Sequence, residues 1–209
     1  MICAGQYHTG LSIMKKIDVT KQTLAIAAMA LTVMPQCLFA DAGKKVSADS
    51  YILLNAEGEP TSTAARCLQD HQTSLVWELK ADDDSLHDKD KNFRWGGVGA
   101  DKVGSIAFND WDTLVKAANK DALCGFTDWR VPTIDELKQL YTLQQSSEIK
   151  PYFSNTQDSP YWSVSAYEKY PEHAQTVHFG NGVSYYYNGY RGNPLPVHLV
   201  RGNKQDVPQ

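Results

Sequence analysis

The sequence predicts an α+β domain in which two helices pack on short antiparallel strands. Three observations lead to this prediction. A strand pattern comes early, two helical patterns lie in the middle, and short strand patterns fill the last third of the 209 residues. Strands and helices do not alternate as a parallel sheet requires. A hydrophobic content of 42% is enough to form a core.

The first 40 residues have the pattern of a leader for export. Residues 1–13 precede the basic Lys15-Lys16 pair, and we interpret them as an upstream extension. Residues 14–40 contain the apolar run 24–34, which is too short to span a bilayer as a helix. We therefore interpret residues 14–40 as a signal peptide, and we expect no membrane span in the mature chain.

The rest of the chain is expected to form one exported domain. Cleavage is predicted after Ala40 or Ala42, and residues 41–50 form a flexible lead-in. The domain is placed at 51–203 and a short tail at 204–209. We expect the product to be periplasmic, at the cell surface or secreted.

The charge of the mature chain argues against nucleic acid as a partner. The leader carries three of the 20 basic and one of the 24 acidic side chains, which leaves 17 and 23, a net charge of −6. Nucleic-acid phosphates need a basic surface, so we exclude that class of ligand.

Two cysteines remain after the leader, Cys67 and Cys124, 57 positions apart. An isolated pair in an oxidising compartment predicts one disulfide bond. The alternative is a redox or nucleophilic cysteine. The sequence contains no C-x-x-C motif, and nothing in it singles out a histidine to activate a thiolate.

The first predicted elements are a strand and a helix. Residues 74–80 (SLVWELK) have a strand pattern, and a long polar loop, 81–92, follows. Asn109 or Asp110 is predicted to cap a helix. Its apolar positions recur at helical spacing: Trp111, Leu114, Val115 and Ala118.

The second predicted helix has a clear N-terminal signal. Thr133 and Glu136 have the spacing of a capping box, and Pro132 keeps the preceding residue extended. Its apolar positions are Ile134, Leu137, Leu140 and Tyr141. Strands are then expected at 161–167, in a hairpin at 174–188 with a Gly-Asn-Gly turn, and at 196–202.

The polar loop offers oxygen ligands for a cation. The candidate residues are Asp82, Asp83, Asp84, Asp88, Asp90 and Asn92. Calcium binds six to eight such oxygens in flexible geometry, so calcium is the candidate cofactor. An EF-hand is excluded because Phe93 and Gly99 stand where that loop needs glycine and glutamate. The alternative is a solvated loop.

Aromatic residues in the last third form the best binding signal. The candidate ligand-binding residues are Tyr161, Trp162, Tyr185, Tyr186, Tyr187 and Tyr190, together with Arg130 for an anionic group. Aromatic faces suit sugar rings and protein epitopes. The alternative is that one set of rings belongs to the core. For Trp129 and Arg130, their place between a cysteine and a capped helix favours a structural role, in which Trp129 fills the core and Arg130 pairs with a nearby carboxylate or bonds loop carbonyls. We predict no catalytic residue.

Several blocks, in order, resemble a known family. Cys67 and SLVWELK are followed by LHDKDKNFRW, LCGFTDWRVPTIDEL, YWSVSAY, VHFGNG and HLVRG. In this order they resemble the Legionella collagen-like protein C-terminal domain family, from about Tyr51 to Arg201. The resemblance implies a fold related to C-type lectins and formylglycine-generating enzymes. It also implies an exported location and, in the name-giving member, adhesion to glycosaminoglycans. This chain has no collagen-like repeat.

These inferences lead to an expected function with two alternatives. We expect a non-enzymatic module that binds a glycan or an envelope protein, as in adhesion. The first alternative is a structural subunit of a pilus, matrix or envelope complex. The second is an enzyme related to formylglycine-generating oxidases, although a shared fold alone does not transfer chemistry.

Overall fold

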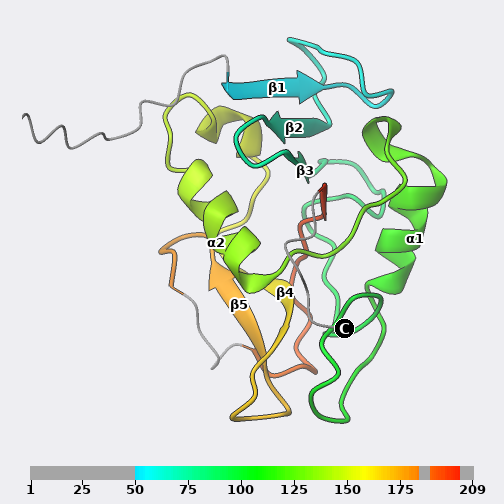
Figure 1. The fold of residues 1–209 in the computed structure, drawn as a ribbon, viewed down its shortest axis with the longest axis vertical. Helices are drawn as coiled ribbons and strands as arrows, with labels where there is room; N and C mark the ends of the chain where they lie inside the picture. The colour runs from blue at the N-terminus through cyan, green and yellow to red at the C-terminus, as the bar shows by residue number, and fades with distance from the viewer. Residues whose placement is uncertain (1–49, 184–188, 203–209) are drawn as a thin grey trace, which may run out of the picture. The chain divides into compact units, whose positions relative to one another are not determined.

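The computed structural model describes residues 50–183 and 189–202. The chain divides into two units, 1–42 and 43–209, and all of the described residues belong to the second. They form two α-helices and short antiparallel strands joined by one disulfide (Figure 1). The α+β prediction is confirmed.

The larger sheet has four strands in the order β1-β2-β3-β6, and all neighbours are antiparallel. The strands are β1 (Tyr51–Leu54), β2 (Cys67–Asp70), β3 (Leu75–Glu78) and β6 (Val200–Arg201). The prediction of a strand at 74–80 is confirmed, whereas β1 and β2 were not predicted. The last strand is shorter than the predicted 196–202, because β6 pairs with β3 only at Val76 and Trp77.

The smaller sheet contains β4 (Pro160–Ala166) and β5 (Ala174–His178). The predicted strand at 161–167 is therefore confirmed to within one residue. In the predicted hairpin at 174–188, β5 forms the first arm, but its described partner is β4. The second arm falls at 184–188, outside the described residues. The turn between the arms contains Gly182 at a φ of 71°, which glycine adopts without strain.

Helix α1 (Asp112–Lys120) packs through Leu114, Val115 and Ala118, as its spacing predicted. The predicted cap is wrong. The N-cap position is Trp111, and no side chain caps the helix. The Asp110 carboxylate instead accepts hydrogen bonds from the guanidinium of Arg94, at 2.7 and 3.1 Å.

Helix α2 (Ile134–Leu143) begins with the predicted capping box. The Thr133 hydroxyl accepts from the Glu136 amide at 3.3 Å, and the Glu136 carboxylate accepts from the Thr133 amide at 2.8 Å. Leu137 and Leu140 are fully buried on its inner face. Among the described residues, no helix has the length and apolar character needed to cross a membrane.

The core contains two clusters of apolar side chains. One holds the disulfide and four of the five tryptophans, and the other holds Trp77 with the inner face of α2. Three buried indoles in the first cluster donate to backbone carbonyls: Trp95 to Ser163, Trp129 to Leu123 and Trp162 to Phe93, at 2.9, 2.9 and 2.7 Å. These side chains fill the core and also fix the loops that surround it.

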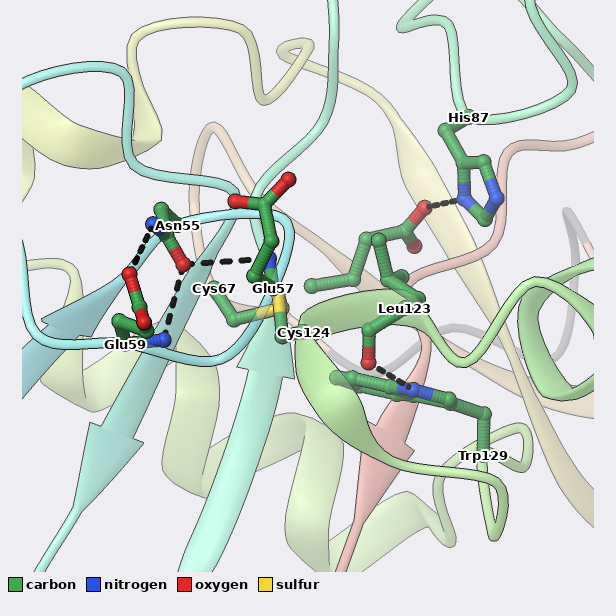
Figure 2. Close-up of a disulfide and its surroundings, with 9 residues drawn as sticks. Asn55, Glu57, Glu59, Cys67, His87, Leu123, Cys124 and Trp129 are labelled. Carbon is green, nitrogen blue, oxygen red and sulfur yellow. Dashed lines mark hydrogen bonds and ion pairs between the residues drawn. A yellow bond between two sulfur atoms is a disulfide. The ribbon is translucent and has the colours of Figure 1, made fainter.

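The predicted disulfide joins Cys67 on β2 to Cys124 in the short 3₁₀ helix η2 (Leu123–Gly125), with an S–S distance of 1.97 Å (Figure 2). The turn after β1 packs directly against this bridge. A Cβ on Gly58, whose φ is 88°, would lie 2.4 Å from the Cys124 carbonyl oxygen. The disulfide therefore connects the sheet, the turn after β1 and the segment that follows α1.

We expect replacement of both cysteines, Cys67→Ala with Cys124→Ala, to lower the free energy of unfolding by about 4 kcal/mol. This value follows from the entropy of closing a 57-residue loop in the unfolded chain. Urea unfolding of the oxidised protein and of the double variant measures the difference. A reductant should destabilise the parent and leave the variant unchanged. Equal midpoints for parent and variant would contradict the prediction.

Candidate functional site

Trp129 and Arg130, in the sequence block LCGFTDWRVPTIDEL, both have structural roles. The Arg130 guanidinium donates to both Glu136 carboxylate oxygens, at 2.7 and 2.6 Å, and the two side chains are only 13% and 9% exposed. The amide and carbonyl of Arg130 also pair with Val200. Arg130 was named as a candidate ligand-binding residue, and its guanidinium holds an internal carboxylate, as the structural alternative for this residue expected.

The Glu136 carboxylate is held in its charged form. Burial opposes ionisation, but hydrogen bonds from Arg130 and Thr133 outweigh it and lower the pKa of Glu136. Because Glu136 also closes the capping box, one carboxylate connects the start of α2 to the strand-like segment that pairs with β6. This arrangement explains the spacing of arginine, threonine and glutamate in the block.

The carboxylates of the acidic loop accept hydrogen bonds from amides of the loop and form ion pairs with neighbouring basic side chains. Asp88 accepts from the amides of Asp83 and Asp90, at 2.6 and 2.7 Å. Asp82 forms an ion pair with Lys89 at 2.7 Å. Asp82, Asp83, Asp84, Asp88 and Asp90 line one shallow hollow with Lys91. Within 50–183 and 189–202, however, no three acidic, histidine or cysteine side chains are grouped to hold a metal ion. Calcium binding by this loop stays a prediction.

A buried group of charged side chains contacts this loop through His87. The sequence analysis did not predict this group. Glu78 on β3 is 1% exposed, and its carboxylate contacts His87 Nδ1 at 2.6 Å and Lys80 Nζ at 3.5 Å (Figure 2 shows His87). Its other oxygen accepts from the Leu199 amide at 3.0 Å. Burial opposes ionisation of Glu78, but the Lys80 charge and the His87 hydrogen bond lower its pKa to about 2. An alternating strand pattern gives no signal for a buried charge at position 78.

His198 lies fully buried near this group. Its ring stacks on Tyr161 with centroids 4.7 Å apart, and Thr156 Oγ1 lies 3.3 Å from Nε2. Burial lowers the pKa of His198 to about 3, and the Lys80 charge acts in the same direction. The imidazole is therefore neutral at physiological pH and serves as a packing group.

The predicted aromatic ligand residues divide into three groups. Tyr161 and Trp162 are fully buried in the two core clusters, as expected for the set of rings that belongs to the core. Both lie on β4, whose residues between Tyr161 and Val164 are all buried. Tyr185, Tyr186 and Tyr187 lie outside the described residues. Tyr190 is 44% exposed.

Tyr190 belongs to a continuous series of rings that we call the aromatic strip: Tyr167, Tyr170, His173 and Tyr190. Neighbouring ring centroids are 5.8, 6.1 and 6.0 Å apart along this series. The strip lies on the connection between β4 and β5, coloured yellow to orange at the foot of Figure 1, and on the segment beside it. Tyr170 is 37% exposed, so two residues of the strip, Tyr170 and Tyr190, are partly accessible to solvent.

Arg191 is buried next to the aromatic strip and hydrogen-bonds to its backbone. It is 1% exposed, and its guanidinium lies 4.0 Å from the centroid of the Trp95 ring. Its Nε donates to the His173 carbonyl at 3.1 Å, and Nη1 donates to the Ile106 carbonyl at 3.0 Å. Its backbone amide donates to the Glu172 backbone carbonyl at 3.0 Å. Arg191 therefore fixes His173 next to Tyr190 and anchors both to the tryptophan cluster. Nothing in the sequence pattern indicated this role.

A polar hollow lies beside the aromatic strip. It is lined by Asp101, Val103, Ser165, Ala166, Tyr167, Glu168, Lys169 and Gln175. Asp101 is fixed by the amide of Ala166 at 2.8 Å, and the Gln175 amide group donates to the Ala166 carbonyl at 3.1 Å. The strip and the hollow together offer ring faces next to hydroxyl, amide and carboxylate groups. Such a surface can bind a ligand without any covalent chemistry.

The fold and this surface define a small disulfide-bonded α+β domain with two exposed tyrosines beside a polar hollow. The family model named Lcl C-terminal domain matches residues 66–201, and the chain belongs to this family. The predicted family is thus confirmed. No curated protein and no solved structure is significantly similar to the chain.

We expect Glu136→Gln to lower the free energy of unfolding by about 3 kcal/mol or more, because it leaves the Arg130 charge buried without a partner. Urea unfolding measures the loss. Lys116→Gln is the control, since its exposed pair with Asp112 at 3.5 Å should contribute less than about 1 kcal/mol. A similar, small loss in both variants would show that the Arg130 pair does not support the scaffold.

We also expect stability to fall as the pH is lowered from about 6.5 to about 2. The unfolded chain takes up a proton on histidine near pH 6.5, whereas folded His198 does so only near pH 3. Likewise, Glu78 protonates near pH 4.5 when unfolded and near pH 2 when folded. The unfolded state therefore binds more protons than the folded state over this range. For each additional proton, the free energy of unfolding falls by about 1.4 kcal/mol per pH unit.

The measurement is urea unfolding at a series of pH values. Between pH 6.5 and 4.5, His198→Gln should reduce the slope of unfolding free energy against pH. His71→Gln, at an exposed position, should leave it unchanged. An unaltered slope in the His198 variant would refute the assignment.

Proposed function

We propose that this domain is an exported, non-enzymatic module that binds a glycan or protein ligand at the cell envelope through the aromatic strip. The observation that carries the proposal is the series of neighbouring rings that contains two exposed tyrosines, Tyr170 and Tyr190. Aromatic faces stack on the apolar faces of sugar rings, and the phenol oxygens at their edges form hydrogen bonds.

Three further observations support a binding role. The strip is prearranged, because Arg191 and the pairing of His173 with Tyr190 fix its backbone before a ligand arrives. Preorganisation lowers the entropic cost of association. The adjoining hollow supplies polar groups, which most ligand sites use to orient a ligand. Cys67 and Cys124 are joined, so neither presents a free thiol as a nucleophile.

The location and the fold relationship belong to the same proposal. The leader pattern of residues 14–40 supports export, and the disulfide is consistent with an oxidising compartment. A relationship to C-type lectins is supported by the combination of two helices, short antiparallel strands and a disulfide. A structural subunit of an envelope complex is the second candidate, since exposed tyrosines also favour protein interfaces.

We expect Tyr170→Ala and Tyr190→Ala each to weaken ligand binding by about tenfold or more, because exposed rings at the centre of a site carry much of the binding energy. A glycan array with the mature domain identifies the ligand, and calorimetry measures each variant. Both variants should keep the parent melting temperature within a few degrees, since neither ring belongs to the core.

The matched control is Tyr152→Ala. This tyrosine is 43% exposed, similar to Tyr190, but it lies in the 3₁₀ helix η3 (Lys150–Phe153) and borders a different groove. Binding should be unchanged in this variant. If the array shows no binding and pull-down from envelope extracts yields a stoichiometric protein partner, the structural-subunit candidate replaces the glycan ligand.

A further inference from the structure

Two hollows on the larger sheet share Tyr51, the first residue of β1, the cyan strand at the top of Figure 1. The first, which we call the Glu148 hollow, has a volume of about 430 Å³ and is lined by side chains of β1, the turn after it and η3. The second, the Lys138 hollow, has a volume of about 390 Å³ and is lined by side chains of β2, β3 and α2. The segment between α2 and η3 contributes to both hollows.

The two hollows carry opposite charges that lack strong internal partners. Glu148 is exposed, and no basic side chain among the described residues forms an ion pair with it. Lys138 is 49% exposed, and its contact with Asp135 at 3.6 Å is an exposed pair of the kind that contributes little. Asp70 in the Lys138 hollow is buried and accepts two hydrogen bonds from its own turn, at 2.8 Å each. Lys138 and Glu148 therefore remain available for charges on another molecule.

Both hollows also present apolar surface. Tyr152 lines the Glu148 hollow and is 43% exposed, and Ile52 and Ile149 line the same hollow. The Lys138 hollow contains Trp77 and Leu143. Tyrosine is enriched in protein interfaces, where its ring fills an apolar hollow of the partner. An exposed ring beside one hollow thus matches the apolar lining of the other.

From these observations we infer that the two hollows form the interface of a symmetric homodimer. A twofold axis beside Tyr51 places the Glu148 hollow of one copy against the Lys138 hollow of the other, and the same contact then occurs twice. Opposite charges meet at both ends of the interface, and Tyr152 of each copy enters the Lys138 hollow of the other. A second copy is the fitting partner because one surface carries both halves of the complementary pair.

Sedimentation equilibrium of the mature domain, at concentrations up to about 1 mM, tests the inference. We expect a monomer–dimer equilibrium. Glu148→Lys and Lys138→Glu should each raise the dissociation constant by about tenfold or more at low salt, because each change places like charges opposite each other at two points. The double variant, Glu148→Lys with Lys138→Glu, should restore the parent dissociation constant, because it only exchanges the two charges.

Two further variants separate this interface from other effects. Tyr152→Ala should raise the dissociation constant by about tenfold or more, because the exposed ring becomes buried in the dimer. Lys116→Glu reverses an exposed charge on α1, outside both hollows, and should leave the dissociation constant unchanged. The melting temperature of each variant, measured in parallel, separates loss of the dimer from loss of the fold.

A monomer at every concentration would overturn the inference, and so would a dimer that none of the variants in the two hollows weakens. A double charge variant that dissociates as readily as the single variants would also overturn it, because opposite charges would then not meet. The inference goes beyond the proposed function and does not depend on it, since the aromatic strip shares no residue with either hollow. Calorimetric binding at the strip should therefore be the same in variants that cannot form the dimer.

Discussion

The covalent link between Cys67 and Cys124 is the constraint on which the architecture depends. It attaches the first residue of β2 to a turn in which Ala122 and Cys124 adopt left-handed backbone angles, φ of 48° and 51°. Such angles are unfavourable for residues with side chains and persist when neighbouring contacts fix them. The Trp129 indole supplies one contact through the Leu123 carbonyl, and the close approach of Gly58 supplies another.

Buried polar groups give the core its specificity. Arg130 pairs with Glu136, and Glu78 pairs with Lys80 and His87, within local segments. The Glu78 carboxylate also accepts from the Leu199 amide, and Arg191 lies over Trp95, and these two contacts join segments that are distant in sequence. Such groups are costly to bury unless they are paired, so each arrangement disfavours other packings of the same segments. The domain thus combines a tryptophan-rich interior with a few polar connections that position its loops.

Sequence reasoning succeeded where a local signal was strong. The capping box depends on two residues only three positions apart, Thr133 and Glu136. It was therefore predicted together with the helix that it begins. The cysteine pair was also correctly predicted. By contrast, β1 and β2 are four residues long, and their pairing partners rather than their own patterns define them. The α1 cap failed because Asp110 has a stronger partner in Arg94, which lies far from it in sequence.

The same reasoning applies to the candidate site. An abundance of tyrosine indicated the part of the chain that contains the aromatic strip, but composition does not tell which ring faces inward. Tyr161 and Trp162 lie on a strand buried on both faces, where alternation gives no distinction. Tyr167, Tyr170 and His173 became a group only because the connection after β4 folds back onto Tyr190.

The residues of the DWRVPTIDEL block serve the scaffold. Asp128 pairs with Arg201, Trp129 fills the core, and Arg130, Thr133 and Glu136 secure α2. The aromatic strip shares no residue with this block. If the aromatic strip binds the ligand as proposed, framework and recognition surface are separate, so a substitution at Tyr170 or Tyr190 would change the ligand and leave the framework intact.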